Sequence, residues 1–311
     1  MQSPPLRRVN VVVKHQSPKF INLSPRRSAA VARPPTPAMN VSPTLRPYMP
    51  VMSQKKLTVL RAARNVMGQM NKNMIEASSA SVQRIKGVGK DRFLIIVGNG
   101  PSTNEAPLEK LKGVEPIDIM SINKPEVRLW PTKWWAICDQ SQYMRHPQYW
   151  AERAVCVITS SAVRAKRDNQ VSIRCRPGKG FSRSLADGFH IGRSTCYASM
   201  QTALWMNYDK IFIFGCDMTA VNGIMWSYQP TMGANPDVDA KSREKRFQYE
   251  AQSYQFAADN LNADEKNKFT FCSSHNPWSF MQFFQRLDQK TAVDEILKLA
   301  ETKRKTVNIL G

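Results

Sequence analysis

The sequence predicts an α/β domain with a mostly parallel sheet and helices on both faces, preceded by an extended basic arm and a helix. Short apolar runs that end at glycine or polar residues recur from Phe93 onwards, as expected of strands buried on both faces. Segments with helical character separate several of these runs. Basic, Pro- and Ser-rich residues are concentrated before the first run, which places them outside the predicted sheet.

The expected strands and helices span residues 92–311. In chain order they are the strands Phe93–Val97, Ile117–Ile122, Trp134–Cys138 and Ala154–Ile158, the helix Ser194–Asn207, the strand Lys210–Phe214, the helix Arg243–Asn260, the strand Phe269–Cys272 and the helix Thr291–Thr302. Strands that alternate with helices favour right-handed crossovers and a parallel sheet. We therefore expect a Rossmann-like domain over this range.

Positive charge is concentrated in the first third of the chain. The 311 residues include 45 Lys and Arg against 24 Asp and Glu, a net charge of +21. Through Arg92 there are 17 basic and 2 acidic residues, so the remaining residues carry a net charge of only +6. Residues 1–54 are rich in Pro, Ser and Arg and contain too little apolar surface to offset their ordering entropy. They are expected to form an arm whose partner is anionic, either nucleic acid or an acidic protein surface.

Residues 55–91 are expected to form an amphipathic helix and a linker. Apolar side chains recur at helical spacing from Leu57 to Ile85, and packing on the chain's own domain is favoured over a dedicated partner. The run Lys86–Gly89 contains two glycines, which should end the helix.

The cysteines and the apolar runs bear on the compartment. The six cysteines form no CxxC pair, which favours reduced buried thiols over a zinc site or a disulfide framework. No metal site is expected. Because no apolar run is long enough to span a bilayer, the expected location is the cytoplasm or a virion. The Arg- and Ser-rich start also fits an organelle transit peptide, but its prolines disfavour the helix that such peptides form.

Small and polar residues follow four of the expected strands. These segments are Gly98–Ser102, Ser121–Asn123, Cys138–Ser141 and Gly215–Thr219. Ligands bind beyond the carboxyl ends of the strands in open α/β sheets, so their convergence predicts a small-molecule site. The first segment matches neither G-x-G-x-x-G nor a P-loop.

A fifth segment, Gly192–Thr195, begins the helix expected after it. The free amides and positive dipole end of a helix N-terminus suit an anion, and Arg193 favours a phosphate there. For Ser194 and Thr195, ordinary N-capping is the alternative interpretation.

The order of these blocks resembles glycosyltransferase family 42, the bacterial sialyltransferases, and the hydroxymethylpterin-diphosphokinase-like family. The resemblance covers about residues 92–285 and is strongest over Val97–Ser102 and Ser194–Asp217. It implies a Rossmann-type fold that binds a nucleotide without a G-x-G-x-x-G loop. It also implies a CMP- or UDP-type nucleotide sugar as the donor, and no further cofactor.

The resemblance assigns roles to individual residues. Asn99 and Ser102 would approach the donor phosphate and sugar, and Asn123 would contact the nucleotide. Thr195 would hydrogen-bond near the transferred group, and Asp217 would organise the loop after its strand. The full nucleotide-binding set is Gly98, Asn99, Gly100, Ser102, Asn123, Arg193, Ser194 and Thr195. The full catalytic set is Asp139, Asp217, Tyr228, Arg243 and Arg246, in which Tyr228 matches a tyrosine that touches the leaving phosphate.

The sequence departs from the family pattern at three positions. The histidine base expected near Arg243–Arg246 is absent, and His190 and His275 are the nearest histidines in sequence. Thr219 replaces a second tyrosine, and Asp139 stands where the sialyltransferases have asparagine. These departures leave open a different donor, another base such as Asp139 or Asp217, or a domain that binds without catalysing.

Three functions are compatible with these observations. The favoured one is a transferase that stabilises a departing phosphate with Arg193, Tyr228 and either Arg243 or Arg246. The second is an inactive structural component of a virion or another large assembly, as a homo-oligomer or assembly subunit, whose basic arm binds neighbours or nucleic acid. An enzyme acting on nucleic acid ranks last, because only the charge of the arm supports it.

Overall fold

The computed structural model describes residues 62, 65, 66, 69, 76, 78–150, 152, 154–161, 163, 167–220, 224, 227 and 236–310. The chain divides into two units, Met1–Met52 and Ser53–Gly311, and every described residue belongs to the second. The arm predicted over residues 1–54 therefore lies outside the described residues. Most of residues 55–77, the first part of the predicted amphipathic helix, also lie outside the described residues.

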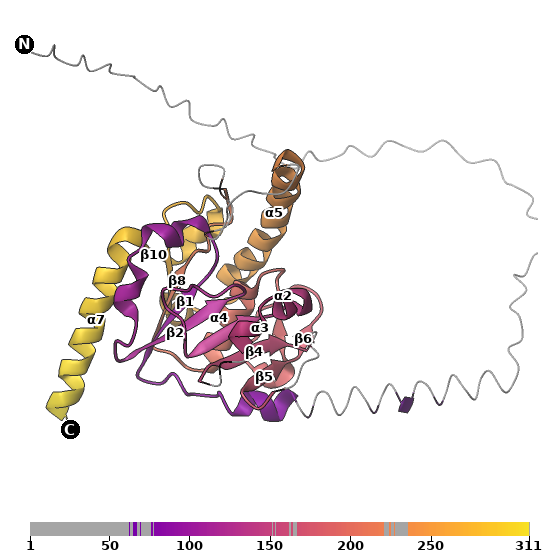
Figure 1. Ribbon diagram of the computed structural model, residues 1–311, viewed down its shortest axis with the longest axis horizontal. Coiled ribbons are helices and arrows are strands. Elements are labelled where there is room, and N and C mark those ends of the chain that lie inside the picture. Colours follow the sequence, from indigo (N-terminus) through magenta and orange to yellow (C-terminus); the bar gives the residue numbers. More distant parts are fainter. Residues whose placement is uncertain are drawn as a thin grey trace, which may run out of the picture. The chain divides into compact units, whose positions relative to one another are not determined.

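The described part of the chain is built on an eight-stranded sheet whose paired strands are all parallel (Figure 1). The strand order is β10-β9-β8-β1-β2-β3-β4-β5. The strands are β1 (Phe93–Val97), β2 (Ile117–Ile122), β3 (Trp134–Ile137), β4 (Cys156–Ser160), β5 (Gln170–Ile173), β8 (Lys210–Phe214), β9 (Phe269–Cys272) and β10 (Gln285–Leu287). The chain builds outward from β1 to β5, then returns to place β8 on the other side of β1. This reversal of direction between β1 and β8 is the topological switch point of the sheet.

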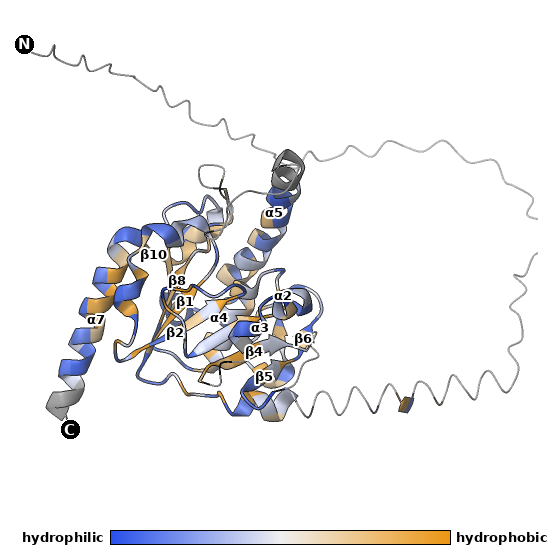
Figure 2. Ribbon diagram, viewed as in Figure 1, coloured by the Kyte–Doolittle hydropathy of each residue, from blue (hydrophilic) through white to orange (hydrophobic). Residues whose placement is uncertain are grey.

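Helices cover both faces of the sheet. On β1, Leu94 and Ile96 face a core shared with α4 (Thr195–Trp205) and α5 (Pro236–Asn260). Ile95 and its odd-numbered neighbours face a second core shared with α7 (Gln289–Leu310). Figure 2 shows hydrophobic residues concentrated on the central strands and a mixture of hydrophobic and hydrophilic residues along α7. β1 is apolar throughout because both of its faces are buried.

The remaining elements are short. They are α2 (Gln140–Arg145), α3 (Pro147–Trp150), α6 (Ala263–Asn267), the 3-10 helices η1 (Pro101–Glu105), η2 (Leu108–Leu111), η3 (Leu185–Asp187) and η4 (Ser279–Phe283), and the paired strands β6 (Cys175–Arg176) and β7 (Phe189–His190). A third apolar cluster forms where β3 and β4 pack against α2 through Trp135, Val157 and Tyr143. The tryptophans of β3 are thus part of the core.

The predicted fold class is confirmed. The strand predicted at Ala154–Ile158 is displaced along the chain and corresponds to β4. The strand begins at Cys156 and continues through Thr159 and Ser160, two residues beyond its predicted end. Both hydroxyls are buried and satisfied, since Thr159 accepts from Gln170 Nε2 at 2.7 Å and Ser160 donates to the Cys138 carbonyl at 2.7 Å. Polar residues can therefore occupy this strand without loss of hydrogen bonds.

The edge of the sheet at β5 is capped by side chains from the segment before β1. Residues 78–83 are helical, and the turn that follows includes Gly87, as predicted. Ser81 Oγ accepts from the Ser172 amide at 3.1 Å, and Ser78 Oγ accepts from the Arg174 amide at 2.9 Å. These contacts satisfy backbone groups that an edge strand otherwise exposes.

A buried carboxylate lies near the amino ends of the strands. Asp118 of β2 is 3% exposed and accepts from Arg92, Lys133 and Tyr208, each at 2.7 Å. Burial alone would raise the pKa of Asp118, but these hydrogen bonds outweigh it and hold the pKa below its usual value. The cluster ties together the residues that precede β1, β3 and β8.

None of the helices among the described residues has an apolar stretch sufficient to cross a membrane.

Candidate functional site

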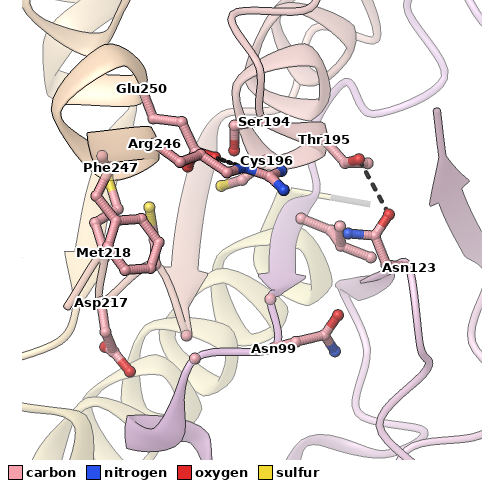
Figure 3. A pocket seen from close by; sticks show the side chains of 15 residues that line it. Asn99, Asn123, Ser194, Thr195, Cys196, Asp217, Met218, Arg246, Phe247 and Glu250 are labelled. Atoms are coloured by element: carbon pink, nitrogen blue, oxygen red, sulfur yellow. Dashed lines mark hydrogen bonds and ion pairs between the residues drawn. The ribbon is translucent and has the colours of Figure 1, made fainter. Parts of the chain in front are cut away.

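A cavity opens at the switch point, beyond the carboxyl ends of β1, β2 and β8 (Figure 3). Its volume is about 90 Å³, well above the roughly 10–15 Å³ that a cavity needs to hold a single water molecule. The wall consists of Gly98, Asn99, Gly100, Ile122, Asn123, Ser194, Thr195, Cys196, Gly215, Cys216, Asp217, Met218, Arg246, Phe247 and Glu250. The cavity therefore brings together eight of the residues singled out from the sequence: Gly98, Asn99, Gly100, Asn123, Ser194, Thr195, Asp217 and Arg246.

The glycines of the cavity wall also allow the loops after β1 and β8 to approach each other. The Gly98 amide donates to the Phe214 carbonyl at 2.8 Å, and the Gly100 amide donates to the Gly215 carbonyl at 2.9 Å. A Cβ atom on Gly100 would lie 2.5 Å from Asp217 Oδ2 and 2.6 Å from the Gly215 carbonyl oxygen. The packing of the two loops thus requires glycine at position 100, whatever the cavity binds.

Asp217 fastens three loops together. Its side chain is 1% exposed and accepts from the Ser102 amide at 2.8 Å and from the Ser102 hydroxyl at 2.6 Å. The Ser273 hydroxyl donates to the same carboxylate. Asp217 therefore holds the loops after β1, β8 and β9 in register. Ser102 is fully buried in this network and is not part of the cavity wall.

The N-terminus of α4 begins at the cavity. Ser194 occupies the N-cap position, but its side chain makes no capping hydrogen bond. Its hydroxyl lies 3.3 Å from the Tyr254 hydroxyl, and the Thr195 hydroxyl donates to Asn123 Oδ1 at 3.0 Å. Ordinary capping by these two hydroxyls is therefore not observed. The positive end of the helix dipole is left without a side-chain oxygen from Ser194.

Two asparagines of the wall are oriented by their neighbours. Asn99 Nδ2 donates to the Lys124 carbonyl at 2.7 Å, so the acceptor oxygen of its amide is the group left for a ligand. The Asn123 Oδ1 atom accepts from Thr195, which leaves Nδ2 as a donor. Figure 3 shows both side chains at the same side of the cavity. The pair offers an acceptor and a donor to one ligand.

Arg246 and Glu250 form an ion pair in the wall on the α5 side. Arg246 Nε lies 2.8 Å from Glu250 Oε1, and Arg246 Nη2 donates to the Arg193 carbonyl at 3.1 Å. The guanidinium extends from α5 toward the start of α4 (Figure 3) and its side chain is 48% exposed. Glu250 is only 8% exposed. Burial raises the pKa of Glu250, an effect only partly opposed by Arg246, Arg243 and Arg193.

Backbone with positive φ is concentrated around the cavity. Asn123 has φ 53°, Arg193 has φ 60° and Met218 has φ 50°. These residues lie in three different loops that meet at the cavity. Left-handed backbone is unfavourable for most side chains other than Asn and Asp, and it is often retained at ligand sites.

Other residues of the sequence-based sets lie outside the cavity wall. Asp139 is exposed and caps α2, where its carboxylate accepts from the Ser141 and Gln142 amides. A hydrogen bond from the Ser141 side chain is the main cause that lowers the pKa of Asp139. Arg193 stacks on Tyr249, with its guanidinium carbon 4.6 Å from the ring centroid.

Of the remaining members, Arg243 acts on the cavity through its charge near Glu250 and does not line it. Tyr228 lies outside the described residues. Neither histidine nearest in sequence lines the cavity, since His190 packs against Gly180, and His275 Nε2 lies 3.0 Å from Glu105. Thr219 is also outside the wall.

All six cysteines are free thiols, and two of them line the cavity. A hydrogen bond with Cys196, followed by burial, raises the pKa of Cys216. Across the part of the chain that the structure describes, no cluster of three or more His, Cys, Asp or Glu side chains is arranged to hold a metal ion.

Cys196, Phe247 and Glu250 are wall residues that the sequence analysis did not assign to the site. Arg246 and Glu250 are four residues apart on a predicted helix, a spacing typical of exposed ion pairs. One feature of the sequence could have pointed to Glu250. It lies close to the Arg243–Arg246 segment, which the family resemblance places near the site.

No family model and no curated protein matches this chain. Three solved structures are similar to it. The sialyltransferase CstII from Campylobacter jejuni in complex with the substrate analogue CMP-3FNeuAc is 12% identical, with a TM-score of 0.35, covering 64% of this chain and 87% of that one. CST-II in complex with a trisaccharide acceptor and CMP is 12% identical, with a TM-score of 0.34 and the same coverage. CstII with cytidine-5'-monophosphate is 14% identical, with a TM-score of 0.35, covering 64% of this chain and 86% of that one. None of these likenesses assigns the chain to a family.

Proposed function

We propose that the cavity binds the phosphate and sugar of a nucleotide-activated donor, of CMP- or UDP-type, and that the protein is a glycosyltransferase-like enzyme. The observation that carries this proposal is the position of the cavity at the switch point between β1 and β8, where α/β sheets bind nucleotides. The substrate would lie against the loops after β1, β2 and β8.

Two features of the wall favour a phosphate. The first is the N-terminus of α4, an 11-residue helix whose N-cap side chain does not occupy the amides of the first turn. The second is Arg246, whose half-exposed guanidinium extends toward that helix. A helix dipole and an arginine directed at the same space provide charge-assisted hydrogen bonds to phosphate oxygens.

The amides of Asn99 and Asn123 supply the directional contacts. With one acceptor and one donor fixed by their neighbours, they suit a ribose, sugar or base that presents hydroxyl, amino or carbonyl groups. We assign them to the non-phosphate part of the donor.

Transfer would rest on stabilising the departing phosphate. Arg246 is the residue placed to do this directly, with Arg193 and Arg243 contributing positive charge from behind it. Tyr228 is proposed as a further phosphate ligand. We assign no proton transfer to Asp139 or Asp217, because one caps α2 outside the cavity and the other is saturated by serine donors.

Calorimetric titration with CMP, UDP, UDP-glucose and CMP-N-acetylneuraminate tests the proposal. The Arg246→Gln variant should weaken binding by about 10- to 150-fold, because charged hydrogen bonds contribute about 1.5–3 kcal/mol. Asn99→Ala should weaken it by about tenfold. Lys245→Gln is the matched control, since Lys245 is exposed, carries the same charge and does not line the cavity. If the wild-type protein binds none of these compounds, the proposed function is wrong.

A further inference from the structure

Two carboxylates line the cavity, and only one of them holds loops of the fold together through hydrogen bonds. Asp217 accepts from Ser102 and Ser273. Glu250 is buried in the wall and has Arg246 as its ion-pair partner. A buried carboxylate beside a proposed phosphate site is unexpected, because two negative groups in one low-dielectric space repel each other.

A bound phosphate would change the electrostatic surroundings of Glu250. On its own helix it faces Arg243 and Arg246, with Tyr254 one turn away, and Arg193 approaches from the loop before α4. Cys196 at the start of α4, and Cys216 and Asp217 after β8, complete the titratable groups of the wall. A phosphate that takes the free side of the Arg246 guanidinium would compensate the positive charge that now stabilises the Glu250 carboxylate.

Protonation of Glu250 resolves this conflict. A neutral carboxyl group removes the repulsion and adds an O–H donor that can reach a phosphate oxygen, while its other oxygen still accepts from Arg246 Nε. Burial already raises the pKa of Glu250 in the empty site, and a bound phosphate would raise that pKa further.

We propose that Glu250 is the proton-carrying residue of the cavity, which takes up one proton when a phosphate-bearing ligand binds and donates a hydrogen bond to that phosphate. This inference rests on the proposed function. In a transfer reaction, the same proton would be positioned to neutralise the leaving phosphate as its bond to the sugar breaks. The affinity for the ligand should consequently increase as the pH falls.

The test is calorimetric titration with UDP-glucose and CMP-N-acetylneuraminate. All their phosphates are esterified, so the ligands themselves take up no proton near neutral pH. Measured at about pH 7 in two buffers of different protonation enthalpy, the wild-type protein should show uptake of close to one proton per ligand bound. Between about pH 8 and about pH 6, binding should tighten by up to about tenfold per pH unit.

The Glu250→Gln variant keeps an acceptor for Arg246 and cannot take up the proton. Its heat of binding should be the same in both buffers, its affinity should be independent of pH, and at about pH 8 it should bind about tenfold more tightly than wild type. Glu244→Gln, an equal charge change at an exposed position of the same helix, should behave as wild type.

The outcomes separate the two proposals. Binding by the wild type with equal heats in the two buffers overturns the role of Glu250 and leaves the proposed function standing, even if Glu250→Gln does not fold. Buffer dependence that persists in folded Glu250→Gln also overturns that role. Absence of binding to both sugar nucleotides, by wild type and variant at every pH, overturns this inference, and the proposed function is overturned with it when CMP and UDP do not bind either.

Discussion

Replacement of Asp217 distinguishes a scaffold from a catalytic base. Its carboxylate is 1% exposed and accepts three hydrogen bonds, one from a backbone amide and two from hydroxyls. In Asp217→Asn, the amide oxygen can still accept from the Ser102 amide, and the new NH2 group can donate to both hydroxyls, which rotate to accept. The charge assistance is lost and the two hydroxyl protons must turn to other acceptors, so we expect a destabilisation of about 1–2 kcal/mol.

Asp217→Ala removes both carboxylate oxygens and with them all three hydrogen bonds. It leaves a buried amide and two buried hydroxyls without partners, at about 1–3 kcal/mol for each group that does not find another. Allowing for hydroxyl rearrangement, we expect about 4 kcal/mol in total. At about 2–4 °C per kcal/mol for a domain of this size, Tm should fall by about 2–8 °C for Asn and about 8–16 °C for Ala.

Thermal unfolding followed by circular dichroism measures both variants, and nucleotide titration measures their sites. Asp294→Asn is the control, since it breaks an exposed pair with Lys110 that is expected to contribute less than about 1 kcal/mol. An Asp217→Ala protein as stable as wild type would refute the loss of stability estimated from the three hydrogen bonds. An Asp217→Asn protein that keeps its stability and ligand binding but loses all transfer activity would refute the scaffold role and reinstate Asp217 as a base.

Three further predictions follow from other parts of the chain. Gly100→Ala should destabilise the fold by about 1–3 kcal/mol in thermal unfolding, because its Cβ has no room between the loops after β1 and β8; unchanged stability would contradict this packing. Asp118 has a lowered pKa, so its stabilisation is present at neutral pH and is lost as the pH falls through that pKa. Acid unfolding of Asp118→Asn should therefore be shallower than that of wild type, starting from a stability lower by about 2–3 kcal/mol. Deletion of residues 1–54 should abolish salt-sensitive binding to duplex DNA or RNA in filter-binding assays, and equal binding by the truncated chain would exclude the arm as the anionic contact.

The central strands could be predicted because their burial is symmetric. Phe93–Val97 and Lys210–Phe214 lie between helices on both sides. Their sequences are therefore apolar apart from Lys210 at the start of β8, and their bounds match the prediction. β5 was missed for the opposite reason. Gln170–Ile173 is a short strand at the edge of the sheet, and its outer backbone groups are satisfied by Ser78, Ser81 and Arg84 rather than by another strand. Such long-range capping leaves no periodic pattern in the strand itself.

The site was predictable to the extent that strand ends determine it. Asn99, Asn123 and Asp217 follow strands directly, and the parallel topology brings those ends to one edge of the sheet. Glu250 instead lies within α5, far along the chain from the end of β8 at Phe214. Whether such a residue faces solvent or the cavity depends on how α5 packs, and α5 has charged residues both on its exposed side and at this buried position. No local rule distinguishes the two.

The backbone of the loops supports the view that this cavity is maintained for a ligand. Met218 has φ 50°, a conformation that costs about 1–2 kcal/mol for a residue of this shape. Trp278 Nε1 donates to its carbonyl at 2.9 Å, and Asn276 Nδ2 donates to the Cys216 carbonyl at 2.7 Å. Glycine at position 218 would relieve the strain. Met218 is 6% exposed and belongs to the core that α4 and α5 share while also lining the cavity, so burial of its side chain offsets the strain. Such strained backbone is often retained at ligand sites.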